Sequence, residues 1–491
     1  MGGLSPQSNR PTSTSDCSCG KESWTDDLHC LDLTRTIQLH QRLRDDLPTR
    51  GAEYAPLLRQ GNEELHRRKI TFGGARDLPT GLTTLLLQRG DVAMLDSAAR
   101  MVHGLVEKTL EWLAADPNRI VARFPHLARM VPYLSATRGW SGKQVVSRYD
   151  AVVTPAGELK VIELNTCCPA GFLHSQSFCD IAQQALATLY PHEDFPLLRA
   201  GAINPEGLVD GLLRIEENAG IAPGMIAALT DENEIYHELD LFLAAVRRKT
   251  TRTAEIVDAR QLEFTNGRLV YRGQPISLTY NKFRISVPTS QNHCWREGFE
   301  DRYAAYLAAV AQGAVVSVNN FYGMALGEDK GILALWSDPD FVHELTPRER
   351  IFVERHVAYT RPLVQGETEW RGQPVRFPDF LYENREQLVI KPAGEGRGFG
   401  VVIGKYATDE TWRAACAVHS AVPCVVQEFV DPVNLPVVVC RSGEVAVEEM
   451  FLTVALATVC GEYQGILSRV SPNPVTNVAR TGMVQAVLVE E

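Results

Sequence analysis

The chain has 491 residues, of which 45% are hydrophobic and 22% are charged, as in average soluble globular proteins. This composition excludes a fibrous or wholly disordered chain, because there is ample apolar surface to bury. The net charge of −11 would repel phosphate backbones, so we expect no nucleic acid among the partners.

The cellular compartment can also be inferred from the sequence. No apolar stretch approaches the roughly 20 residues that cross a bilayer, and the N-terminus has no basic run followed by an apolar one. We therefore expect neither a membrane partner nor a secretory signal. The eleven cysteines are odd in number and scattered, which does not suggest a disulfide framework. We expect a cytoplasmic protein.

Hydrophobic periodicity changes along the chain and predicts a mixed α/β (α+β) protein. The N-terminal tail is rich in Ser, Thr, Pro and Gly and is expected to be flexible. A helical region follows, then a β-hairpin with a helix after it, then alternating strands and helices typical of a small, largely parallel sheet, and finally a segment with several strands and one helix. The predicted divisions are 1–30, 31–140, 141–215, 216–325 and 326–491.

The most informative stretch is LVIKPAGEGRGFGVVIG. A predicted strand delivers Lys391 to a loop that contains Gly394, Gly396, Gly398 and Gly400, and a second strand leaves the loop. Glycines let the backbone approach a ligand closely and point N–H groups at phosphate oxygens. A Walker loop or a dinucleotide fingerprint should open a helix, so neither fits this strand–loop–strand context. An ordinary glycine-rich hairpin is the alternative.

A second set of polar side chains lies in the sequences RYD and ELN, on two adjacent predicted strands. Asp150 and Glu163 share one face if the hairpin pairs in simple register, and Asn165 points the same way as Glu163. Carboxylate and amide oxygens suit Mg²⁺, and Arg148 could neutralise charge on a transferred phosphoryl group. The alternative is a surface hairpin with scattered charges.

Together these segments resemble the ATP-grasp superfamily of carboxylate–amine ligases. In that superfamily an Arg-x-Asp strand precedes a Glu-x-Asn strand that ends in Asn-x-x-Pro-Gly or a similar sequence, and here RYD is followed by ELNTCCPAG. The metal-ligand strands precede both ATP lysines, an order that resembles the circularly permuted branch with its glutathionylspermidine synthase-like proteins. The resemblance covers about residues 140 to 491. It implies an ATP-grasp fold with a pre-ATP-grasp substrate domain at 216–325 and a nucleotide-binding domain at 326–491.

The resemblance implies ATP and Mg²⁺ as cofactors and assigns roles to individual residues. The magnesium ligands would be Asp150, Glu163 and Asn165. The catalytic arginines would be Arg148 and Arg469, the second of which lies near the C-terminus in GILSRVSPNPVTN.

For the nucleotide, the resemblance implies two lysines, a glycine-rich lid and a hinge strand whose backbone pairs with adenine. The ribose would be bound by either Asp431 or Asn434. The implied ATP-binding residues are Lys330, Lys391, Gly394, Glu395, Gly396, Arg397, Gly398, Gln427, Glu428, Phe429, Val430, Asp431 and Asn434. For the substrate we expect Asn477 and Arg284, although a surface ion pair is an equal alternative for Arg284.

The expected activity is ATP-dependent formation of an amide or peptide bond through an acyl phosphate. The partners would be an amine acceptor and a small carboxylic acid, which we expect to be an amino acid. The chain could also form a homodimer. One alternative is transfer of the activated acid to the thiol of a carrier protein. Another is a catalytically inactive ATP-binding partner subunit, although the intact set of site residues speaks against it.

Overall fold

The computed structural model describes most of the chain beyond the N-terminal tail. The described residues are 30–72, 76–78, 81–136, 144–167, 169–231, 237–283, 298–394, 396, 398–417, 423–441, 444–478 and 481–490. Three predicted site residues, Arg284, Glu395 and Arg397, and the tail up to residue 29 therefore lie outside the described residues. No helix among the described residues is long and apolar enough to cross a membrane.

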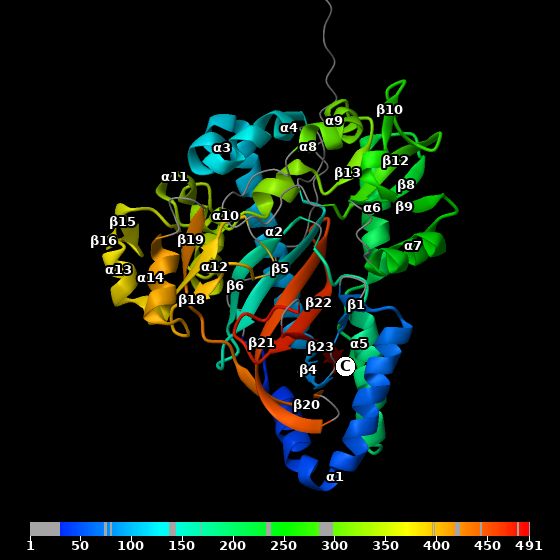
Figure 1. Ribbon diagram of the computed structural model, residues 1–491, viewed down its shortest axis with the longest axis vertical. Helices are drawn as coiled ribbons and strands as arrows, with labels where there is room; N and C mark the ends of the chain where they lie inside the picture. Colours follow the sequence, from blue (N-terminus) through cyan, green and yellow to red (C-terminus); the bar gives the residue numbers. More distant parts are fainter. Residues whose placement is uncertain are drawn as a thin grey trace, which may run out of the picture.

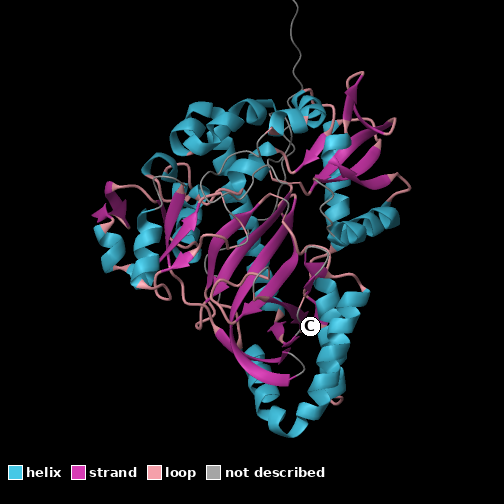
Figure 2. Cartoon of the chain, viewed as in Figure 1, coloured by secondary structure: helices cyan, strands magenta, loops and turns pink. Residues whose placement is uncertain are grey.

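Within the described residues, the centre of the molecule is a nine-stranded sheet (Figures 1 and 2). Its strands are β3 (Gly81–Leu82), β4 (Thr84–Leu87), β5 (Val146–Val153), β6 (Leu159–Asn165), β7 (Arg199–Ala200), β20 (Asn434–Arg441), β21 (Glu444–Val459), β22 (Glu462–Ser471) and β23 (Met483–Val489). Six of them follow the order β3-β20-β21-β22-β23-β4, while β5 pairs with β21 and β6, and β7 pairs with β23. β21 has 16 residues, so it pairs with β20 along its first half and with β5 along its second. The β5–β6 hairpin is thereby anchored on C-terminal strands.

Helices cover both faces of the central sheet. They are α1 (Thr34–Arg67), α2 (Arg89–Ala115), α3 (Pro117–Arg123), the 3₁₀ turn η1 (Pro125–Met130), α4 (Val131–Ala136) and α5 (Ser175–Leu189). Side chains of β20 alternate between the two faces: Val437 packs in the core that contains α2, and Val438 packs in the core that contains α1 and α5. This alternation is the period-2 pattern of a strand buried on both sides.

The N-terminal region that the periodicity predicts as helical also contributes strands to the central sheet. β4 runs parallel to β23, and β3 pairs with β20. All four residues of β4, TLLL, are buried. A short apolar run of this kind cannot be distinguished from a helix segment by periodicity, and its partners lie at the other end of the chain.

A second sheet, of six described strands, is the small, largely parallel layer that the sequence predicts. Its strands are β8 (Met225–Thr230), β9 (Ala254–Asp258), β10 (Glu263–Thr265), β11 (Arg268–Tyr271), β12 (Gln274–Asn281) and β13 (Val316–Val318). β8, β9, β12 and β13 are parallel, and β10 and β11 extend β12 as an antiparallel meander. The flanking helices are α6 (Pro205–Ala219), α7 (His237–Lys249), α8 (Phe299–Arg302) and α9 (Ala304–Ala311). The π-helix η4 (Tyr322–Gly327) follows β13 and leads to Lys330.

The third sheet carries the glycine-rich loop. Its strands are β14 (Thr360–Pro362), β17 (Leu388–Pro392), β18 (Val402–Ile403) and β19 (Cys424–Glu428), in the order β14-β19-β17-β18. Around it are α10 (Gly331–Leu335), α11 (Pro339–Val342), α12 (Pro347–His356), the hairpin β15–β16 (Gly366–Trp370 and Gln373–Phe377), α13 (Asp379–Glu383), the 3₁₀ turn η5 (Arg385–Gln387) and α14 (Asp409–Ala417). Trp412 and Leu381 pack under the sheet. The glycine-rich loop joins β17 to β18, and its described residue Gly398 lies next to Val475, in the segment that follows β22.

The remaining described elements are short. They are β1 (Thr71–Phe72), β2 (Arg76–Asp77), and the 3₁₀ turns η2 (Phe195–Leu197) and η3 (Ala259–Gln261).

Candidate active site

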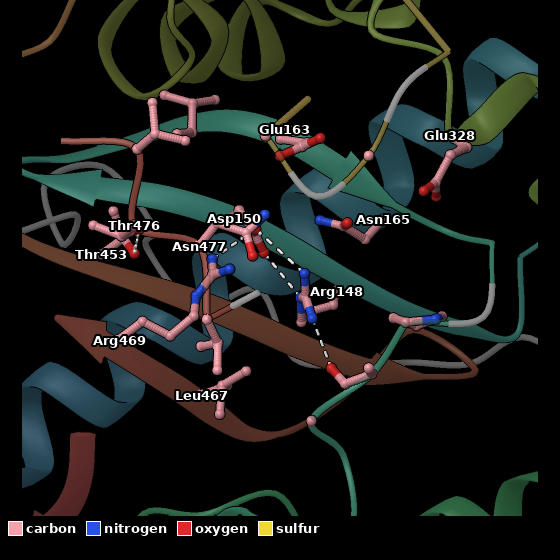
Figure 3. A pocket seen from close by; sticks show the side chains of 18 of the residues that line it. Arg148, Asp150, Glu163, Asn165, Glu328, Thr453, Leu467, Arg469, Thr476 and Asn477 are labelled. Carbon is pink, nitrogen blue, oxygen red and sulfur yellow. Dashed lines mark hydrogen bonds and ion pairs between the residues drawn. The ribbon is translucent and has the colours of Figure 1, made fainter. Parts of the chain in front are cut away.

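A cavity of about 700 Å³ opens where the three sheets meet. Its walls come from the β5–β6 hairpin, from the glycine-rich loop and β19, from β22, and from the end of β12 with Lys282 and Phe283. Residues more than 200 positions apart in the sequence therefore line the same cavity. Lys391, for example, donates a hydrogen bond to the carbonyl oxygen of Ile162. Figure 3 shows part of this cavity.

The hairpin places four of the predicted residues on one face. Asp150 lies directly opposite Glu163 in the register of β5 and β6. Arg148 lies opposite Asn165. A bulge interrupts the pairing after Asp150 and leaves Ile162 without a cross-strand partner. The Ile162 carbonyl oxygen instead accepts hydrogen bonds from Lys391 Nζ at 3.2 Å and Gln427 Nε2 at 3.3 Å, which joins the hairpin to the glycine-rich sheet.

Two arginines hold the carboxylate of Asp150 (Figure 3). Arg148 Nε donates to Oδ1 at 2.9 Å, and Arg469 Nη2 donates to Oδ2 at 2.6 Å. Burial would raise the pKa of Asp150, but the two guanidinium groups outweigh it and hold the pKa below its ordinary value. Arg148 also donates to the carbonyl oxygen of Ala170 at 2.6 Å. Nε of Arg469 is buried and has no hydrogen-bond partner among the described residues, so it can still donate to a ligand.

The two predicted ATP lysines have different partners. Lys330 Nζ lies 3.0 Å from Glu163 Oε1. Burial alone would lower the pKa of Lys330, but Glu163 outweighs it and raises the pKa. Lys391 Nζ donates to the neutral Oε1 of Gln427 at 2.6 Å, and burial together with the nearby charge of Lys330 lowers its pKa to about 8 despite Glu163. The backbone N–H of Lys330 donates to the Ala393 carbonyl oxygen at 3.0 Å, which ties both lysines to one loop.

The hairpin residues fit a magnesium ion. Glu163 and Asn165 line the cavity side by side on β6, and Nδ2 of Asn165 is buried without a hydrogen-bond partner among the described residues. A bound phosphate oxygen would accept a hydrogen bond from this nitrogen, which would leave Oδ1 of the same amide for the metal, and carboxylate and amide oxygens are ligands that Mg²⁺ accepts. Both oxygens of Asp150 accept hydrogen bonds from arginines, and each oxygen keeps a further lone pair with which it could ligate the metal.

The predicted hinge residues lie along and after β19. Gln427, Glu428, Phe429 and Val430 line the cavity. Glu428 is held by the backbone N–H of Tyr359, which donates to its Oε1 at 3.0 Å, and by an ion pair with Arg371. The backbone N–H of Phe429 donates to the Gln387 carbonyl oxygen at 2.7 Å.

The two ribose candidates do not line the cavity. Asp431 pairs with Lys405, whose Nζ lies 2.6 Å from its Oδ1. Asn434 is exposed at the start of β20. At this corner the cavity wall contains Val430 and Pro432 instead.

The glycine-rich loop comes close to the segment that follows β22. Gly394, Gly396 and Gly398 line the cavity, and so does Asn477. Gly398 has φ +68°, and a Cβ built on it would lie 2.7 Å from Val475 Cγ1. Glycine is therefore required here both by the left-handed backbone and by the close approach.

Several cavity residues escaped the sequence reasoning. Glu328 accepts hydrogen bonds from the backbone N–H groups of Thr166 at 2.6 Å and Cys167 at 2.7 Å. Lys282 donates to the Pro169 carbonyl oxygen at 2.7 Å and lies 3.7 Å from the carboxylate of Glu238. The only signal in the sequence is proximity: Glu328 lies two residues before Lys330, and Lys282 two residues before Arg284.

These sheets and their shared cavity form an ATP-grasp-type α/β fold, as the motifs predicted. Among solved structures, the chain is similar to a glutathione synthetase-like effector (GSS30) from Globodera pallida in its apo form, with a TM-score of 0.58. The match covers 94% of this chain and 100% of that chain. Sequence identity is 11%, so the likeness concerns the fold alone. No family model and no curated protein matches the sequence.

Proposed function

We propose that this chain is an ATP-dependent ligase that joins the carboxylate of a small acid, an amino acid, to an amine through an acyl phosphate. The observation that carries the proposal is the meeting of Arg148, Lys330 and Lys391, from three distant segments, beside the oxygens of Glu163 and Asn165. The name of the structural neighbour, glutathione synthetase-like, agrees with a ligase. The order of the motifs, with the hairpin before both lysines, supports the circularly permuted branch.

The two lysines would bind the triphosphate. Lys330 is paired with Glu163, and Lys391 is hydrogen-bonded to neutral oxygens. A phosphate can therefore approach each ammonium group without having to displace another positively charged group. Magnesium bound by Glu163 and Asn165 would neutralise further phosphate charge. Positioning and charge neutralisation of this kind supply most of the catalysis in phosphoryl transfer.

The two arginines would bind the acid substrate. Asp150 holds both guanidinium groups at the cavity wall, and a planar guanidinium can grip a carboxylate with two parallel hydrogen bonds. The unpartnered Nε of Arg469 is one donor for this purpose. The glycine-rich loop, closing over the phosphates, would keep water from the acyl phosphate.

The test is phosphate release from ATP, measured with a panel of amino acids, each with and without an amine. We expect ADP and phosphate to form only when an acid is present, and an amide product, detected by mass spectrometry, when an amine is added. Glu163→Gln should abolish turnover, whereas Glu344→Gln, a matched change at an exposed carboxylate, should leave it unchanged. ATP binding without ADP formation in any combination would instead favour an inactive ATP-binding subunit, and a product on a carrier thiol alone would favour acyl transfer.

A further inference from the structure

The acidic side chains that line the cavity differ in their partners. Within the described residues, five of the six lie within ion-pair distance of a basic side chain. These pairs are Asp150 with Arg148 and Arg469, Glu163 with Lys330, Glu238 with Lys282, Asp329 with His126, and Glu428 with Arg371. The sixth, Glu328, has no basic side chain within ion-pair distance among the described residues. It is therefore the cavity carboxylate that remains available to a cationic ligand.

The position of Glu328 is set by the backbone. One oxygen, Oε2, accepts hydrogen bonds from the N–H groups of both Thr166 and Cys167, in the turn that follows Asn165. The other oxygen, Oε1, has no hydrogen-bond partner among the described residues. Two amide donors that converge on one oxygen fix the position of that oxygen. Figure 3 shows Glu328 beyond Asn165, on the side away from Arg148 and Arg469.

Glu328 lies near the charges of Lys330 and Glu163, and apolar side chains line the cavity on its other side. Met324 and Ala325 of η4 line the cavity just before it, and Leu127 and Met130 of η1 line the cavity near its neighbour Asp329, to which His126 is bonded. A charged ligand group that enters such a site loses its water and must find an opposite charge there. The site thus suits a cation attached to an apolar stem.

We propose that Glu328 binds the ammonium group of the acceptor substrate, an amine with an apolar stem, on the side of the metal hairpin opposite the acid-binding arginines. This inference rests on the proposed ligase function. It places the acid at Arg148 and Arg469 and the ammonium at Glu328, with Asn165 between them (Figure 3). The ammonium must lose a proton, which the carboxylate of Glu328 can accept, before its nitrogen forms the C–N bond and the phosphate leaves. A carboxylate at this point would also discriminate against neutral acceptors, because an alcohol would leave Glu328 without a counter-charge.

The first experiment measures binding and needs no turnover. Ligand-observed NMR compares n-butylammonium with butan-1-ol, its neutral counterpart, at pH 8, where the carboxylate is ionised because burial raises the pKa of Glu328 only to about 7. We expect the wild type to bind n-butylammonium at least about tenfold more tightly than butan-1-ol. Glu328→Gln should remove this difference, while Glu344→Gln should keep it. Glutamine retains an oxygen for the two backbone donors, so the fold should survive.

Two results, one from this experiment and one from a parallel measurement of Mn²⁺ binding, would overturn the proposal. One is equal binding of n-butylammonium to the wild type and to Glu328→Gln. The other is weaker binding of Mn²⁺, followed by electron paramagnetic resonance, in Glu328→Gln, since that would make Glu328 a metal ligand.

The second experiment separates this proposal from the proposed function. Hydroxylamine is largely neutral at pH 8 and traps acyl phosphates as hydroxamates. We expect Glu328→Gln to form hydroxamate within about twofold of the wild type, and to lose at least about tenfold in kcat/KM for the ammonium-bearing acceptors of the amine panel. Equal loss in both reactions would overturn the role of Glu328. Absence of hydroxamate in the wild type would refute the ligase function itself, while the NMR comparison would still decide whether Glu328 binds a cation.

Discussion

Lys391 provides the most quantitative prediction. Its ammonium is buried against neutral oxygens, and its pKa is lowered to about 8. If Lys391 binds the triphosphate, several negative charges will approach it and raise its pKa again towards the ordinary value of 10.5 or above. ATP binding should then draw a proton onto the protein.

The size of this proton uptake follows from the pKa. With a pKa of about 8, roughly half of the Lys391 side chains are neutral at pH 8, and roughly a tenth at pH 7. ATP binding should therefore take up about half a proton per nucleotide at pH 8. Because the complex holds the extra proton, affinity must fall as pH rises through 8, by about tenfold between pH 7 and pH 9.

Isothermal titration calorimetry in phosphate and Tris buffers measures the uptake, because the observed enthalpy includes the ionisation of whichever buffer supplies the proton. Lys391→Arg is the matched control: its guanidinium stays charged at these pH values, so it should bind ATP without proton uptake and without the pH dependence. The reasoning would be refuted if the wild type took up no proton at pH 8. It would also be refuted if Lys391→Arg took up as much as the wild type.

Three further predictions concern stability and the glycine-rich loop. Asp150→Asn should destabilise the protein by about 3–5 kcal/mol, because it leaves two buried guanidinium groups without a counter-charge; an unchanged urea midpoint would contradict this. Glu328 has a folded pKa of about 7, above its ordinary 4.5, so its protonated form favours folding below pH 4.5 and that contribution is lost as pH rises through 7. The free energy of unfolding of Glu328→Gln, relative to that of the wild type, should therefore rise by up to about 3 kcal/mol between pH 4.5 and pH 8. Urea titrations of both proteins at the two pH values measure this difference, and an unchanged difference would contradict the reasoning. Gly398→Ala should destabilise the native loop conformation by about 1–2 kcal/mol, because Gly398 has a positive φ and an added Cβ would clash with Val475. It should also raise the KM for ATP several-fold in steady-state assays. An unchanged KM would place the loop away from the nucleotide.

Local pattern determined a large part of the candidate site. Strand side chains alternate with a period of two, so Asp150 must share a face with Arg148, and Glu163 with Asn165, wherever the hairpin lies. The glycine spacing after Lys391 likewise indicated a loop whose backbone adopts positive φ, and Gly398 and Gly400 have positive φ. These features depend only on backbone stereochemistry over a few residues.

Tertiary structure alone decided the partners of those side chains. Asp150 meets Arg469 because β5 pairs with β21 and β21 with β22, and the sequence separation of 319 positions leaves no local trace of that contact. Glu328 is held by backbone N–H groups 161 and 162 positions away, and backbone groups carry no side-chain signal. The physical reason is that burial of both faces of the central sheet, rather than any local preference, brings these segments together and excludes the water that would otherwise solvate their charges.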